Sequence, residues 1–370
     1  EAEKAMQLYE KAQHYYFIIS FMSPRGGVIS PPGGLAEHYL SLATWGTDPK
    51  QRQELLKKSE DAGIEALKTA RDSGIPLAIS NVLHVISKTL RSRANAETEP
   101  KQKLALLEKA LQYRKEAIST IQRVTPFDYW NLGVYHDLPA EIKAELSNIA
   151  PSPEDKKRFL EEAISSKEES LKLCGKVMPC FEKMGVLSYF ATFQKSQDTY
   201  ATLLTRFYDM TGNPEVLTKA ISVLEKALES GTKLNLISRM AESHWKIAKI
   251  HDALGQHVQA AEHFAYASEK YLQAAERIPQ LKCLYQDLAS YMQAWIEIEK
   301  ARNHHVKKQY GLAREHYENA SALHGSIERL KYLRQNYLAW SKLEEAEDLS
   351  RREQTEQARA LFQEAAGLFV

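Results

Sequence analysis

The chain has 370 residues, of which 26% are charged and 44% hydrophobic, and 49 basic residues against 48 acidic ones leave a formal net charge of +1. This balance gives no electrostatic reason to expect a nucleic-acid partner, so we expect none. Three cysteines in so long a chain argue against a disulfide framework and fit a reducing compartment, so we expect a cytoplasmic protein. No apolar run approaches the roughly 20 residues that span a bilayer, and no signal peptide is recognisable, so we expect no membrane association.

A first amphipathic helix is predicted over residues 5–22. It ends at SPRGGVISPPGG, residues 23–34, because proline and glycine forbid a regular helix there. A phosphate-binding loop of the Walker type requires a lysine and a serine or threonine after the last glycine, but Leu35 and Ala36 follow here. We therefore interpret 23–34 as a connecting loop. Because the chain begins with Glu1 inside a repeat pattern, we expect a fragment or a chain that lacks a preceding part.

Helical periodicity continues along the rest of the chain. Asp48 and Pro49 precede a helix that Gly74 ends, as capping residues usually do. The motif YWNLGVYH, residues 129–136, is followed by a stretch, 137–157, that we interpret as an insertion before the next helix. No segment shows the sustained alternation of a strand, and we expect about fourteen helices in all. Further helices are predicted over residues 34–46, 75–94, 99–124 and 159–170.

One pattern recurs: a small residue, an aromatic residue four positions later, and a small residue three after that. AREHYENA is one copy, and its first alanine is Ala313. Two antiparallel helices joined by a short turn approach closely only where alanine or glycine separates their backbones. We therefore expect the first alanines of the copies to be buried at helix crossings, together with alanines twelve residues earlier. The first alanines are Ala260, Ala313 and Ala358, and the earlier alanines are Ala248, Ala301 and Ala346.

This arrangement resembles the tetratricopeptide repeat family, a helix–turn–helix unit with the pattern W-x2-L-G-x2-Y followed by A-x3-F. YWNLGVYH matches the first part of that pattern, and residues 241–267 match a whole unit. The resemblance implies an all-α fold, a right-handed α-solenoid of antiparallel helix pairs. It covers most of 200–370 and is patchier in 1–199, and we expect these two halves to form one continuous solenoid. The first alanines step from 260 to 313 and from 313 to 358, 53 and 45 residues, so the repeats are longer than the family's.

The resemblance also implies a non-enzymatic scaffold or adaptor that binds a protein or peptide along a concave face. In regular members, first helices build that face at positions fifteen and eleven before the first alanine. Trp245, Lys249 and Arg302 fall at these positions, and they suit an acidic or carboxylate-ended peptide. The alternative is that Lys249 and Arg302 are ordinary solvated residues. Trp295 and Trp340 occupy the same position as each other in successive repeats, at a different distance from the first alanine. We expect both to pack between helices.

No pattern indicates catalysis, a cofactor or a metal. His244 and His251 lie seven residues apart on one predicted helix, but a metal site requires a third ligand, so we expect none. An alternative function is an all-helical enzyme with its site at the 23–34 loop or the 137–157 insertion. The fragment-like start favours a further version of the scaffold, the sensor part of a larger regulatory protein.

Overall fold

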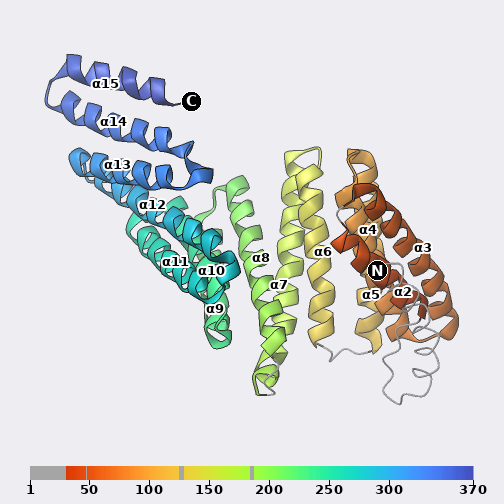
Figure 1. The fold of residues 1–370 in the computed structure, drawn as a ribbon. Helices are drawn as coiled ribbons and strands as arrows, with labels where there is room; N and C mark the ends of the chain where they lie inside the picture. The colour runs from red at the N-terminus through yellow and green to blue at the C-terminus, as the bar shows by residue number, and fades with distance from the viewer. Residues whose placement is uncertain (1–30, 47, 125–128, 184–186, 370) are drawn as a thin grey trace. The chain divides into compact units, whose positions relative to one another are not determined.

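A computed structural model describes residues 31–46, 48–124, 129–183 and 187–369. The helix predicted over residues 5–22 and residues 23–30 of the expected loop lie outside these ranges. The described residues form fourteen α-helices, two short 3-10 helices and no strand, which confirms the all-α prediction. Within each of the two units described next, consecutive helices pack against each other, as expected of a helical repeat protein (Figure 1).

The chain forms two compact units, Glu1–Val186 and Leu187–Val370. The expected halves, 1–199 and 200–370, meet inside a helix that belongs to the second unit. Unit 1 contains α2 (Pro31–Trp45), α3 (Pro49–Ser73), α4 (Pro76–Ala96), α5 (Pro100–Val124), α6 (Tyr129–Ile149) and α7 (Pro153–Lys183). Unit 2 contains α8 (Leu187–Thr211), α9 (Pro214–Leu234), α10 (Ile237–Ala253), α11 (His257–Arg277), α12 (Lys282–Val306), α13 (Tyr310–Ser326), α14 (Leu333–Arg351) and α15 (Thr355–Leu368), with 3-10 helices at Pro279–Leu281 and Glu328–Leu330.

Capping residues set several helix ends where the sequence places them. The side chain of Asp48 accepts hydrogen bonds from the first backbone N–H groups of α3, and Pro49 follows it. Gly74 ends α3 in the left-handed conformation, with φ of 67°. Asn213 and Pro214 begin α9 in the same way. A proline in the first turn removes an N–H that has no helical partner, so it costs the helix nothing.

The same reason corrects one expectation about the 23–34 loop. Its last four residues, 31–34, are not loop but the first turn of α2, because the two prolines occupy positions where no helical hydrogen bond is lost. The described helix continues to Trp45, one residue before the expected end at Gly46.

The expected insertion at 137–157 is also mostly helical. α6 runs through Pro139 to Ile149, and α7 begins at Pro153, so only 150–152 connect them. Leu138, Ile142 and Leu146 lie on one side of α6 and are buried in the core that it shares with α3, α4 and α5. This buried face holds the helix together across the proline, which would otherwise weaken it.

Gly133, the glycine of YWNLGVYH, lies where α6 crosses α7. A Cβ atom at this position would clash with the sulfur of Cys174 and would lie 2.9 Å from the backbone oxygen of Ser170. The motif therefore marks a close helix crossing, as in the family that it resembles.

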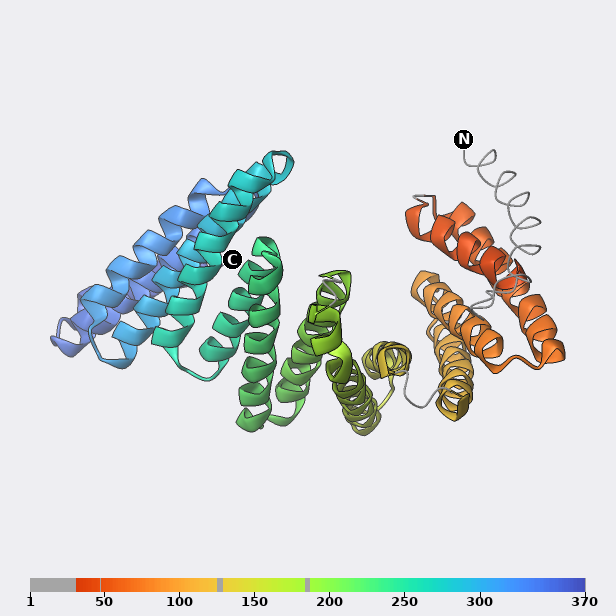
Figure 2. The ribbon, with the colours of Figure 1, turned by 90° about the horizontal axis from the view of Figure 1, so that it is seen from below.

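The last three hairpins of unit 2, α10/α11, α12/α13 and α14/α15, repeat one design (Figure 2). Ala260, Ala313 and Ala358 are 0%, 0% and 3% exposed, which confirms that the first alanines are buried. Their earlier partners, Ala248, Ala301 and Ala346, are fully buried as well. Within this unit, the hairpins follow one another side by side in chain order (Figure 1).

The turns of these hairpins share a backbone conformation. Gly255, Lys308 and Glu353 have φ values of 70°, 59° and 64°, in the left-handed region. The N–H of the glutamine that follows each of them donates to the carbonyl five residues earlier, at 2.8, 2.9 and 3.0 Å. The same turn conformation therefore recurs in all three hairpins, although only one of the turns has the glycine that favours a left-handed residue. Among the described helices, none is long and apolar enough to cross a membrane.

Candidate functional site

The three predicted binding residues all lie in unit 2, but they do not form one group. Trp245, on α10, is half-buried and packs edge-on against Tyr291 of α12, with ring centroids 6.0 Å apart. It belongs to the apolar core between α10, α11 and α12. The indole therefore holds two hairpins together instead of presenting a ring to solvent.

Lys249 and Arg302 do come together, and the ring between them is Trp295. The Lys249 ammonium lies 4.9 Å from the centre of that ring, and the Arg302 guanidinium carbon lies 5.9 Å from it. Trp295 is half-buried and stacks on Phe264, with centroids 5.5 Å apart. Lys249 and Arg302 thus lie at corresponding positions of α10 and α12, but the ring between them, Trp295, lies eighteen residues before Ala313 and not fifteen.

Arg302 is already paired with carboxylates. Its guanidinium forms an ion pair with Asp252 of α10 and another, at 3.1 Å, with Glu299 one turn earlier on α12. Burial disfavours the charge on Arg302, but the two carboxylates outweigh it and raise its pKa above the ordinary value. Burial raises the pKa of Glu299, although a 2.8 Å contact with His257 opposes that effect.

Asp252, His257 and Glu299 have ligand atoms within 4.8 Å of one another, which is the spacing of a metal site. The Arg302 guanidinium contacts two of these three side chains. A cation is thus already supplied by the chain, and a metal ion would have to displace it. We therefore assign this group to the interior ion-pair network of unit 2.

Lys249, by contrast, is exposed, and within the described ranges it forms no ion pair with a carboxylate. A ladder of aromatic rings leads away from Trp295 through Tyr291, His324 and Tyr337, with successive centroids 6.2, 5.8 and 4.9 Å apart. Trp340 lies beyond it on α14 and is 41% exposed, so the expectation that this tryptophan is packed holds only in part. Lys249 is thus an unpaired cation on the first ring of this series.

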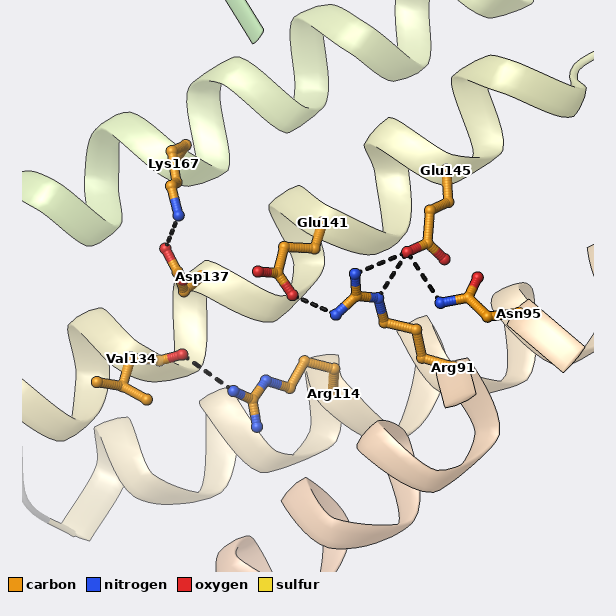
Figure 3. Close-up of polar contacts among 8 residues, drawn as sticks. All are labelled: Arg91, Asn95, Arg114, Val134, Asp137, Glu141, Glu145 and Lys167. Atoms are coloured by element: carbon orange, nitrogen blue, oxygen red, sulfur yellow. Dashed lines mark hydrogen bonds and ion pairs between the residues drawn. The ribbon is translucent and has the colours of Figure 1, made fainter. Parts of the chain in front are cut away.

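Unit 1 contains a second group of charged residues, which sequence analysis did not single out (Figure 3). Arg114, on α5, is fully buried, and its Nε donates to the carbonyl of Tyr135 at 2.8 Å. Pro139 lies four residues after Tyr135 and has no N–H to offer that carbonyl, so the arginine acts as the substitute donor. A second guanidinium nitrogen donates to the carbonyl of Val134 at 3.1 Å, and a third contacts Nδ1 of His84.

Burial fixes the protonation of this group. Burial, together with the neighbouring Arg114 charge, lowers the pKa of His84 to about 2. His84 is therefore neutral, and because its Nδ1 accepts from Arg114, its hydrogen is on Nε2. Burial also lowers the pKa of Arg114 to about 9, which still leaves it charged at neutral pH.

The acidic residues at the start of the expected insertion form ion pairs with residues of neighbouring helices. Asp137 pairs with Lys167, a lysine that is itself buried, and Glu141 and Glu145 both pair with Arg91 of α4 (Figure 3). Such bonds connect α4, α6 and α7 and leave these carboxylates little freedom to act as an acid or a base. In the sequence, the signal for this group of charged residues was the proline inside the helical pattern of α6.

A surface hollow of about 360 Å³ between α3, α4 and α5 is a further concave feature of unit 1. Its polar lining consists of Lys50, Gln53, Glu54, Lys57, Arg93 and Glu97. Glu54 is paired with Lys58 at 2.9 Å, and Arg93 is paired with Glu60.

No protein-family model matches the chain, and no curated protein matches its sequence. Among solved structures, the chain is similar to a "DHF58 filament", with 19% identity, 56% of this chain and 94% of that chain covered, and a TM-score of 0.34. It is also similar to a circular tandem repeat protein with novel repeat topology, with 12% identity, 99% and 89% coverage and a TM-score of 0.34. A third is a signal-transduction ATPase with a tetratricopeptide repeat sensor from Pyrococcus horikoshii, with 15% identity, 91% and 56% coverage and a TM-score of 0.26. The helical-repeat fold rests on the packing of the described helices themselves, and these comparisons show no family membership.

Proposed function

We propose that the chain is a non-enzymatic helical-repeat scaffold or sensor, and that unit 2 binds an acidic segment of a protein or peptide partner. The binding surface consists of Lys249, Trp295 and Arg302, and we refer to it as the Lys249 surface. The observation that carries the proposal is the exposed Lys249 ammonium, 4.9 Å above the half-buried ring of Trp295 and without a carboxylate partner among the described residues.

The three residues contribute differently. Asp252 and Glu299 compensate the charge of Arg302, so it orders the edge of the surface instead of attracting a partner. Lys249 supplies the uncompensated charge, and the ring beneath it excludes water from one side of an incoming carboxylate. A preformed surface of this kind binds without large backbone change, which limits the entropic cost of association.

The proposal is tested with a random peptide library selected on the full chain. We expect selected peptides to be rich in aspartate and glutamate. Lys249→Glu should weaken their binding by at least about tenfold, because it replaces attraction by repulsion at the centre of the surface. The matched control is Lys226→Glu, which makes the same charge change at an exposed position of α9. Selected peptides without acidic residues, or equal affinity for the two variants, would contradict the proposal.

Arg302→Glu is not suitable as the main test. It would place a third carboxylate beside Asp252 and Glu299, and the resulting repulsion would destabilise the contact between α10 and α12. Loss of binding in that variant would then have two explanations. Lys249 is exposed, so its substitution changes the surface with little effect on packing.

A further inference from the structure

Three histidines gather on the α10/α11 hairpin, away from the core. His244 and His251 lie on α10, and His263 lies on α11 between them. The Nδ1 atoms of His244 and His263 are 3.1 Å apart, and the ring of His263 stacks on that of His251 with centroids 5.4 Å apart. All three are half-buried. The third imidazole that the α10 pair lacks in sequence is therefore supplied by the facing helix.

The spacing of the two Nδ1 atoms suits a shared metal ion. Two nitrogen ligands at the usual 2.0–2.1 Å from a tetrahedral zinc ion are roughly 3.4 Å apart, only a few tenths of an ångström more than here. In the metal-free chain one hydrogen lies between these atoms, donated by one ring and accepted by the other. On metal binding that hydrogen moves to Nε2 of its own ring, so both imidazoles offer a lone pair at Nδ1 and remain neutral.

His251 is oriented by a neighbouring amide. Its Nδ1 lies 2.6 Å from the Oε1 atom of Gln256, the residue that begins the turn into α11. An Nδ1–H that donates to this oxygen leaves the lone pair on Nε2, the nitrogen through which this ring would bind a metal ion. To bind an ion held by the other two rings, the His251 side chain has to rotate and give up its hydrogen bond to Gln256.

The next hairpin offers an internal comparison, because its residues correspond to these 53 positions further on. There Glu297 stands in place of His244, and it is paired with the Lys300 ammonium at 2.8 Å and with His316 at 2.7 Å. The residue that corresponds to Lys300 in the first hairpin is Ile247, which is buried. The second hairpin thus contains a cation paired with Glu297, whereas in the first His244 and His263 contact each other and the ring of Tyr266.

We propose that His244, His251 and His263 bind one divalent transition-metal ion of the class that prefers imidazole, such as Zn²⁺. His244 and His263 chelate the ion through Nδ1, and His251 completes a three-histidine set that leaves one position open to solvent or a partner. The site is separate from Asp252, His257 and Glu299, where Arg302 supplies the positive charge. It is independent of the Lys249 surface and adds a metal dependence to the scaffold.

The test uses the metal-free full chain, purified without a histidine tag. Zn²⁺ is titrated by calorimetry and Co²⁺ by visible absorption at pH 7.5. We expect one equivalent of either ion to bind with micromolar affinity, and Co²⁺ to give the intense visible bands of a tetrahedral site. His244→Ala and His263→Ala should each abolish this binding, and His251→Ala should weaken it about tenfold or more.

The control is the double variant His304→Ala with His316→Ala, which removes the corresponding pair of the second hairpin and should leave the bound equivalent unchanged. Circular dichroism of each variant verifies that the helices remain folded. Absence of metal binding to the parent chain, retention of binding in His263→Ala, or an equal loss in the control would each overturn the assignment.

Discussion

The buried Arg114 is expected to stabilise α6 by replacing the backbone donor that Pro139 lacks. Arg114→Met keeps a side chain of similar length and removes the guanidinium. The Tyr135 carbonyl then loses a 2.8 Å hydrogen bond inside the core, and the helix has no N–H at position 139 to replace it. Removal of Pro139 should restore that N–H, so Pro139→Ala makes Arg114 less important.

The magnitude follows from the contacts of the guanidinium. Loss of a donor to a buried carbonyl costs about 1–3 kcal/mol, and Arg114 donates to two carbonyls and contacts His84. Its stacking over Tyr135, 4.5 Å from the ring centre, adds about 1 kcal/mol. The substitution also removes a buried cation, and the burial of a charge is unfavourable, which offsets part of this sum. We therefore expect a net loss of roughly 3 kcal/mol in the stability of α6. In the Pro139→Ala background the loss should be smaller by about 1–2 kcal/mol.

The assay is native-state hydrogen exchange of α6 amides in the parent, the two single variants and the double variant. Exchange reports the free energy of opening of this helix alone, which matters because a chain with two units need not unfold in one step. If Arg114→Met destabilises α6 equally with and without Pro139, the guanidinium is not a substitute donor and the reasoning fails.

Three further predictions concern unit 2. Ala313→Leu should destabilise the α12/α13 hairpin by about 1–3 kcal/mol in a thermal melt, whereas Ala322→Leu, at an exposed position of the same helix, should not. Equal melting temperatures of the two variants would refute the placement of Ala313 at a helix crossing. Lys308→Gly should stabilise by up to about 1 kcal/mol in urea, because it relieves a left-handed residue, and destabilisation would refute this. Burial lowers the pKa of His324 to about 4. The neutral ring therefore gives its full contribution to stability above pH 6.5, and this contribution falls by about 3 kcal/mol towards pH 4. His324→Phe should remove this part of the pH dependence of stability, and an unchanged pH profile would refute the prediction.

The fold was largely predictable because it rests on local rules. Alanines at a shared phase mark the helix crossings, and Asp48 and Gly74 mark helix ends. The exceptions arose where proline stood within a helix. A rule that proline breaks helices predicted a loop at 31–34 and an insertion after 137, but first-turn prolines are tolerated and Pro139 is compensated by Arg114, which lies 21 residues before Tyr135.

The candidate site was predicted only in part because its partners are distant in sequence. Periodicity brought Lys249 and Arg302 to one surface, but it combined them with Trp245 because positions counted within a hairpin do not show which ring of the next hairpin lies beside them. It did not show that Asp252, 50 residues from Arg302, neutralises that arginine. Contacts of this kind depend on how whole hairpins stack, and the first-alanine spacing of 53 and then 45 residues shows that their stacking is not uniform.

The most direct test of the Lys249 surface is a double-mutant cycle with an acidic peptide selected on the full chain. Each aspartate or glutamate of the peptide is replaced by its amide, and affinities for the parent and Lys249→Met are measured by fluorescence anisotropy. We predict that one acidic residue couples to Lys249 by at least about 1 kcal/mol, a fivefold effect that weakens as salt is added. Coupling near zero for every acidic residue of the peptide would contradict a function based on this surface.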